Sequence, residues 1–180
     1  MNTPETTPTA VTVPDVLRAV AGCAWRTARL VATGQLTMPT ELVGRRLTLG
    51  DGTTPVIFRT TERPGAPTSD PSVLEVRFRL RWIGHRRALH RIFLTTCIIN
   101  TPLFAGFPGF RRKQWMYDEQ TSVYRGLYDW DGPDRAVWYA ERLRRVLLLV
   151  AVPASIDYQV LPGRAVDDLL RDGDLYELAG

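Results

Sequence analysis

The sequence predicts an α+β fold of the ferredoxin-like kind, in which helices cover an antiparallel sheet. Three observations support it. Between residues 74 and 161 the hydrophobic periodicity reads strand, helix, strand, strand, helix, strand. Within residues 74–82 apolar and charged side chains alternate without a break, as in a strand with one buried face. A tight turn at residues 119–121 joins two strands whose aromatic residues occupy alternate positions.

The first predicted elements are a disordered tail and a helix. Residues 1–12 are rich in Thr and Pro, and we expect them to be disordered. A helix starts with Pro14 in its first turn and stops at Gly34. Arginines interrupt it, so it is not expected to span a membrane. It either lies on a membrane surface or, as we favour, packs on the domain. The stripe expected to be buried is Leu17, Val20, Ala21, Ala24, Ala28 and Val31.

A hairpin and a linker follow this helix. Residues 47–49 and 56–59 read as short strands around a turn at residues 50–52. Residues 62–72 contain three prolines, which indicates a linker or an exposed loop.

The regular part of the chain then begins. Its predicted strands are residues 74–82, 110–118, 122–130 and 156–161, and its predicted helices are residues 85–99, 135–149 and 165–170. The chain therefore divides into a disordered tail (1–12), an extension of helix, hairpin and linker (13–72), a ferredoxin-like domain (73–162) and a C-terminal tail with a helix (163–180).

Composition and absent motifs narrow the function classes. The net charge is +4, and Lys113 is the only lysine, so the positive charge is almost all arginine. Cys23 and Cys97 are too few for a disulfide framework or a zinc site, which favours a cytoplasmic protein. Nucleotide-binding and hydrolase motifs such as GxGxxG and GxSxG are absent from the sequence. We therefore expect no cofactor, no metal and no nucleic acid partner.

Residues 108–139 carry the most specific motifs of the chain. Pro-Gly-Phe precedes a strand, that strand contains Lys-x-Trp-x-Tyr, and the next one contains Tyr-x-Gly-x-Tyr-x-Trp and runs into a helix. This layout resembles the second half of proteins in the dimeric α+β barrel superfamily, in particular YdhR-like monooxygenases and antibiotic-biosynthesis monooxygenases. The resemblance implies a homodimer and small-molecule chemistry without a cofactor. The chain is longer than a minimal barrel protomer, so its extension has no counterpart in that pattern.

Alternation places several large rings on one face of the two central strands. If the aromatic faces of the strands coincide, these rings surround Gly126, a residue that leaves room for the close approach of a ligand. Such a wall suits a planar or polycyclic small molecule, although it is also typical of an ordinary core. The predicted substrate-binding residues are Trp115, Tyr124, Gly126, Tyr128 and Trp130.

Three residues are candidates for catalysis. Lys113 shares the aromatic face and could hold an anionic substrate oxygen, unless it is a solvated lysine at a strand end. His90 lies at the edge of a helical stripe and is a candidate general base, whereas His85 looks like a surface residue. Tyr117 is the alternative group for removing a proton.

The charged face of the first core strand carries Arg77, Arg79 and Arg81. If this face is buried at a dimer interface, Glu75 and Asp129 are the candidate partners. If it faces solvent, it could attract an anionic substrate or an acidic carrier protein.

The sequence thus favours a cofactor-independent, monooxygenase-like enzyme of secondary metabolism acting on an aromatic or polyketide-like substrate. The substrate would be deprotonated and its anion stabilised before reaction with O2. A cyclase or isomerase needs the same groups without oxygen. Two further classes stay open: a haem-binding or haem-degrading protein with His90 or His85 as axial ligand, and a non-catalytic interaction module.

Overall fold

The computed structural model describes residues 13–49, 51–65, 68–81, 93, 101 and 104–172. The tail predicted at residues 1–12 lies outside them. So does the helix predicted at residues 85–99, apart from Phe93, which is helical.

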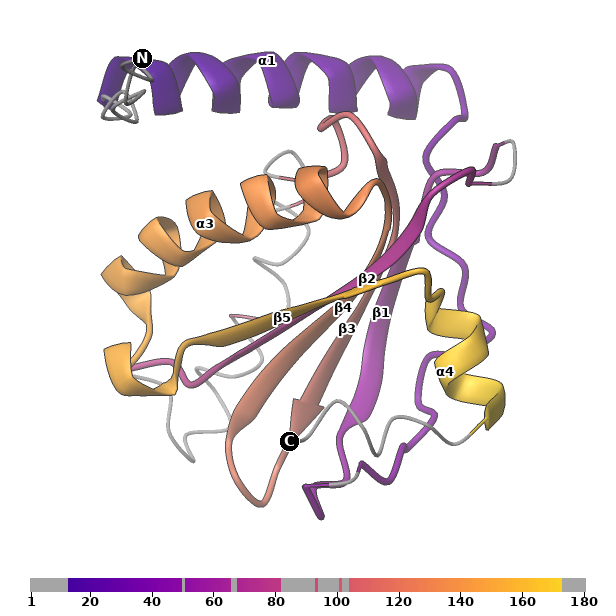
Figure 1. The fold of residues 1–180 in the computed structure, drawn as a ribbon, viewed down its shortest axis with the longest axis vertical. Helices are drawn as coiled ribbons and strands as arrows, with labels where there is room; N and C mark the ends of the chain where they lie inside the picture. Colours follow the sequence, from indigo (N-terminus) through magenta and orange to yellow (C-terminus); the bar gives the residue numbers. More distant parts are fainter. Residues whose placement is uncertain are drawn as a thin grey trace, which may run out of the picture.

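Five antiparallel strands form one sheet in the order β1-β3-β4-β2-β5 (Figure 1). The strands are β1 (Val56–Glu62), β2 (Pro71–Phe78), β3 (Phe110–Asp118), β4 (Val123–Asp131) and β5 (Asp157–Pro162). The sheet and its helices confirm the predicted α+β class, and β2 to β5 are the four strands predicted for the ferredoxin-like domain. β1 comes from the predicted extension, yet it forms the edge strand beside β3.

The largest shift in strand limits concerns β2. The alternation predicts a strand over residues 74–82, whereas the observed strand is Pro71–Phe78. Phe78 pairs with Tyr124, near the start of β4, so the partner strand ends there. Beyond it the pairing continues as a single bridge between Leu80 and Ala151. Alternation therefore predicted the faces correctly, but the length of β4 sets the limits of the strand.

The helices with described bounds lie where the sequence predicts them. They are α1 (Val13–Ala32), α3 (Pro133–Val150) and α4 (Val166–Asp172), and the 3-10 turn η2 (Pro153–Ser155) follows α3. α1 stops as predicted at Gly34, whose φ of 67° is easily adopted by glycine. In the described part of the chain, no helix combines the length and hydrophobicity that crossing a membrane requires.

The buried side of α1 differs from the prediction. Cys23, Thr27 and Leu30 are buried, whereas Val31 is 57% exposed and Ala28 is also exposed. The buried side faces the loop that contains Gly106, where the backbones come into direct contact. The packing of α1 is therefore decided by this close backbone approach, and the stripe of small apolar residues did not indicate it.

α3 covers one face of the sheet, which we call the aromatic face (Figure 1). Ala136, Tyr139 and Ala140 of α3 are buried there against the rings of the strands. The buried residues that β2, β3 and β4 contribute are Ser72, Leu74, Val76, Phe78, Phe110, Lys113, Trp115, Tyr117, Tyr124, Gly126, Tyr128 and Trp130.

The opposite face is covered by the chain itself. Leu47 and Leu49 of the predicted hairpin and Leu169 of α4 pack on Met116, Leu127 and other apolar residues of the strands. A sheet with helices on one face only would need a second copy of the chain to cover its other face. This part of the sheet is covered by its own chain, so the homodimer stays a prediction that rests on the resemblance.

A buried ion pair lies on this covered face. Arg125 Nη1 is 2.5 Å from Glu75 Oε1, and both side chains are 2% exposed. Arg125 also pairs with Asp51 of the hairpin, and Gln159 donates a hydrogen bond to Glu75 at 3.1 Å. Burial raises the pKa of the Glu75 carboxyl even though Arg125 and Arg77 oppose this. The cluster fastens the hairpin to the middle of the sheet.

The three arginines that follow Glu75 have separate surroundings. Arg77 pairs with Asp157 on the neighbouring strand. Arg79 is exposed. Arg81 donates hydrogen bonds to the carbonyl oxygens of Leu148 and Ala151, at 2.9 Å and 2.6 Å, at the C-terminal end of α3, where a positive charge is favourable.

The two acidic residues predicted as partners of these arginines, Glu75 and Asp129, form ion pairs with other arginines. Glu75 faces Arg125, with Arg77 nearby. Asp129 pairs instead with Arg112, whose Nε lies 2.9 Å from the carboxylate. Asp129 is therefore not the partner of the arginine row.

Gly106 is expected to be essential for the seating of α1. A Cβ at this position would overlap the carbonyl oxygen of Cys23 and lie 3.0 Å from Arg26 Cβ. We expect Gly106→Ala to lower the free energy of unfolding by about 1–3 kcal/mol, as overpacking does. Gly22→Ala is the control, because a Cβ there meets nothing within 4 Å, and alanine stabilises a helix by about 1 kcal/mol over glycine. Urea denaturation measures both, and a Gly106→Ala protein as stable as wild type would contradict the packing.

Candidate functional site

The aromatic faces of β3 and β4 coincide, which is the condition under which their rings form one wall. In the register of the two strands, Lys113 pairs with Tyr128 and Trp115 with Gly126. The next pair on this face, Tyr117 with Tyr124, brings two rings to 4.6 Å between centroids. All the predicted rings of this wall are buried, with at most 9% of each exposed.

Lys113 is enclosed by aromatic rings. Only 4% of the residue is exposed, so it is not a solvated lysine at a strand end. Its Nζ lies 2.9 Å from the ring centroid of Trp115, 4.5 Å from that of Phe104 and 4.6 Å from that of Tyr128. An ammonium group over aromatic faces is attracted by their electron density, more strongly when water is excluded. We refer to Lys113 and these three rings as the lysine cage.

Several buried hydrogen-bonding groups next to the lysine cage have no partner in the part of the chain that the structure describes. They include the indole Nε1 of Trp115, the hydroxyl of Thr61 and the hydroxyl of Thr101. Thr61 pairs with Lys113 in the register of β1 and β3, and the carbonyl of Thr101 accepts the N–H of Phe104. A buried polar group without a partner costs free energy, and a ligand with acceptor oxygens would remove that cost.

A β-bulge lies beside the lysine cage. The register of β1 and β3 shifts between Ile57 and Arg59, and Arg59 is left opposite Trp115. The bulge turns Phe58 towards the same ring, at 6.2 Å between centroids. Arg59 Nη1 is buried and finds no hydrogen-bond partner within the described ranges. Bulges often re-aim side chains next to functional sites.

The space above Gly126 is filled by the chain. A Cβ on this residue would lie 2.8 Å from the ring of Tyr128 and 3.3 Å from Lys113 Cε. We expected the glycine to admit a ligand. In the structure, the absence of a side chain at Gly126 leaves room for the Tyr128 ring and the Lys113 side chain to pack over it, so the glycine is needed for the lysine cage.

A hydrogen bond between two tyrosine hydroxyls connects the lysine cage to α3. Tyr128 hydrogen-bonds to Tyr139, which is fully enclosed between the sheet and the helix. Burial raises the pKa of Tyr139 far above its ordinary value, so this phenol stays protonated at neutral pH. Of the predicted catalytic residues, Lys113 and Tyr117 lie on the same strand, whereas His90 lies outside the described residues.

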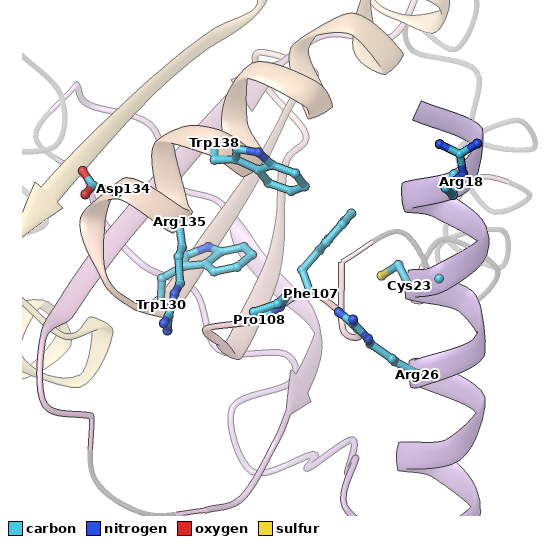
Figure 2. A pocket seen from close by; sticks show the side chains of 10 residues that line it. Arg18, Cys23, Arg26, Phe107, Pro108, Trp130, Asp134, Arg135 and Trp138 are labelled. Atoms are coloured by element: carbon cyan, nitrogen blue, oxygen red, sulfur yellow. The ribbon is translucent and has the colours of Figure 1, made fainter. Parts of the chain in front are cut away.

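A separate cavity of about 670 Å³ lies between α1 and the start of α3 (Figure 2). Figure 2 shows the rings of Phe107, Trp130 and Trp138 around this space and the thiol of Cys23 pointing into it from α1. Burial raises the pKa of that thiol, so it is a poor nucleophile. Trp130 is the one predicted substrate-binding residue that lines this cavity.

Among the residues that the structure describes, no group of three or more His, Cys, Asp or Glu side chains is placed to hold a metal ion.

Three residues of the site were not predicted from the sequence: Phe104, Thr61 and Arg59. Phe104 lies in the loop before β3, and nothing in its local pattern shows that it reaches the Lys113 ammonium. Thr61 lies opposite Lys113, and Arg59 opposite Trp115, only because β1 joins the sheet. The Lys-x-Trp-x-Tyr pattern was the one local signal for this site.

Comparison with known proteins adds one fold neighbour. No model of a known protein family matches the chain, and no curated protein matches it either. Among solved structures, the chain is similar to an uncharacterized ferredoxin-fold protein from Listeria monocytogenes, described as related to antibiotic biosynthesis monooxygenases. The two share 12% sequence identity with a TM-score of 0.46, and the match covers 63% of this chain and 66% of that one, just under two thirds. The fold assignment here rests on the strand order itself.

Proposed function

We propose that this protein is a small-molecule enzyme that stabilises the anion of a planar aromatic or polyketide-like substrate next to Lys113. The observation that carries the proposal is the lysine cage. A buried ammonium group lies among three rings, beside the indole N–H of Trp115 and the hydroxyl of Thr61, both without partners among the described residues. These rings are packed together, so a planar substrate enters when they move apart; the rings then stack on it, and the N–H and O–H groups donate to its oxygen atoms.

The electrostatics of the lysine cage favour an anion that forms during the reaction. A positive charge held in a water-excluded site acts on a developing negative charge more strongly than it does in water. Lys113 is fixed by the surrounding rings, so little reorganisation is needed when the charge appears. The remaining predicted binding residues, Tyr124 and Trp130, extend the aromatic surface on either side.

The proposed reaction is monooxygenase-like. His90 or Tyr117 removes a proton from a carbon next to a carbonyl group, and Lys113 stabilises the resulting enolate. The enolate gives electrons to O2. One oxygen atom is incorporated at that carbon, and the other leaves as water with two hydrogens from the substrate. A cyclase or isomerase would use the same deprotonation without O2.

Oxygen uptake with anthrone tests the proposal. Anthrone is tricyclic, its CH2 group is acidified by the carbonyl, and its oxidation to anthraquinone consumes one O2 and forms one water. We expect the protein to accelerate O2 uptake in proportion to its concentration, with equal amounts of O2 consumed and anthraquinone formed. Anthrone that binds without O2 uptake would support the cyclase or isomerase instead. Absence of both binding and acceleration would count against the proposal.

A further inference from the structure

The cavity between α1 and α3 has apolar walls. Phe107 and Pro108 come from the loop before β3, Trp130 from the end of β4 and Trp138 from α3 (Figure 2). Gly22 and Cys23 of α1 form the opposite side. A volume of about 670 Å³ is in the range of small-molecule sites, and mostly apolar walls with a few polar groups are typical of them.

A second cavity, lined by arginines, shares Arg26 with the first. This second cavity has a volume of about 390 Å³, and Arg29 and Arg63 line it together with Arg26. Among the described residues, no carboxylate forms an ion pair with any of these three arginines. Thr33 and Gln35 add polar groups to the same cavity. The second cavity therefore presents positive charge that no ion pair within the described residues neutralises.

The charged groups at the rest of the larger cavity are mixed. Arg18 and Asp134 lie on its lining, and Arg135 contacts Asp131 at 3.3 Å. Trp130 adds an aromatic ring to the lining, while its indole Nε1 is buried and has no hydrogen-bond partner among the described residues. The mixed charges at this end therefore give a ligand no single charged group to bind.

We propose that α1 forms a binding site for an amphipathic anion. Its apolar chain lies in the larger cavity between α1 and Trp138, and its carboxylate or phosphate group lies at Arg26, Arg29 and Arg63. Guanidinium groups bind both kinds of anion through paired hydrogen bonds. This site goes beyond the proposed reaction. None of the residues of the lysine cage lines it, Trp130 is the one predicted substrate-binding residue that does, and binding here requires no chemistry.

Three probes with alkyl tails of similar length test the proposal: decanoate, decyl phosphate and decyltrimethylammonium, each below its critical micelle concentration. Isothermal titration calorimetry measures their dissociation constants. We expect both anions to bind and the cation to bind at least about 10-fold more weakly, because the arginines repel it. The ratio of decanoate to decyl phosphate distinguishes a carboxylate site from a phosphate site. Equal binding of all three probes, or no binding of either anion, overturns the proposal.

Gly22→Leu tests the position of the apolar chain. Gly22 lines the cavity, and a Cβ there meets nothing within 4 Å, so leucine can extend into the empty space. Leucine also favours a helix more than glycine does, so α1 stays folded. We expect the dissociation constant of decanoate to rise about 10-fold or more in this variant, because the leucine side chain occupies the space. Gly22→Ala is the matched control and is expected to bind as wild type; a Gly22→Leu protein that also binds as wild type overturns the proposal.

Arg26→Gln with Arg29→Gln tests the anionic group. Both arginines are exposed residues of α1, so the double variant is expected to fold. We expect decanoate to bind about 10-fold to 100-fold more weakly, as for lost hydrogen bonds to a charged group, and neutral decanol to bind unchanged. Arg45→Gln, an exposed arginine away from both cavities, is the control for net charge and is expected to bind as wild type. If the double variant keeps the wild-type preference for anions, the arginines are not the site.

Discussion

Replacing Arg125 with methionine is expected to lower the free energy of unfolding by about 3–5 kcal/mol. Arg125 and Glu75 are both 2% exposed, and the variant leaves the Glu75 carboxylate buried without its cationic partner. The pairing of Arg125 with Asp51, which fastens the hairpin, is lost as well. Chemical denaturation at neutral pH measures the change.

The effect of Arg125→Met is expected to depend on pH. Burial already raises the pKa of Glu75 in the folded protein, and removing Arg125 raises it further. The folded variant then holds a proton that the unfolded chain releases, so stability is lost as the pH rises through the folded pKa. We therefore expect a larger destabilisation at about pH 8 than at about pH 5.

Two controls separate the buried pair from ion pairs in general. Changing Glu75→Leu together with Arg125→Met removes both charges and is expected to restore most of the lost stability. Arg77→Met breaks a more exposed pair with Asp157 and is expected to cost less than about 1 kcal/mol. An Arg125→Met protein within about 1 kcal/mol of wild type would show that the buried pair does not hold this face together.

Lys113→Met is expected to reduce the rate of anthrone oxidation by about 10²-fold to 10³-fold, the effect of removing one group that stabilises an oxyanion. Methionine is of similar length and is apolar, so the aromatic rings stay in place and the protein stays folded. The loss is expected in kcat, because the charge acts mainly on the enolate that forms during the reaction. Stopped-flow or electrode measurements of O2 uptake follow it.

Gln114→Met is the matched control for Lys113→Met. Gln114 is the next residue of the same strand, is fully buried, and points to the opposite face of the sheet. Both of its side-chain amide atoms lack a hydrogen-bond partner among the residues that the structure describes, so methionine is tolerated there. We expect this variant to oxidise anthrone at the wild-type rate. Equal losses in the two variants would mean that the Lys113 charge has no specific role.

The strand pattern predicted the aromatic face because its information is local. β3 and β4 are neighbours joined by a tight turn, so their register follows from the turn, and alternation then decides which rings share a face. The Lys-x-Trp-x-Tyr spacing therefore placed Lys113 beside Trp115 correctly. Its enclosure by Phe104 depends on a loop that no periodic pattern describes.

The rest of the site and the role of the extension depend on contacts between distant segments. β1 joins the sheet beside β3 and brings Thr61 to Lys113, although its residues read as part of a separate hairpin. α1 was expected to bury a stripe of small apolar residues, but its contact with the backbone at Gly106 turns Cys23 inward instead. The cavity that lies under α1 follows from that contact, and the sequence offered no sign of it.

The lysine cage as a site for a planar organic anion is tested most directly by native mass spectrometry of protein purified from its own cells, alongside an absorbance spectrum. Wild type and Lys113→Met are compared in parallel. We expect wild type to carry a co-purified organic mass, the Lys113→Met protein to lack it, and neither to show a Soret band. A wild-type protein without bound mass, or the same mass at equal occupancy in both, would contradict the account, and a Soret band would assign the protein to haem binding instead.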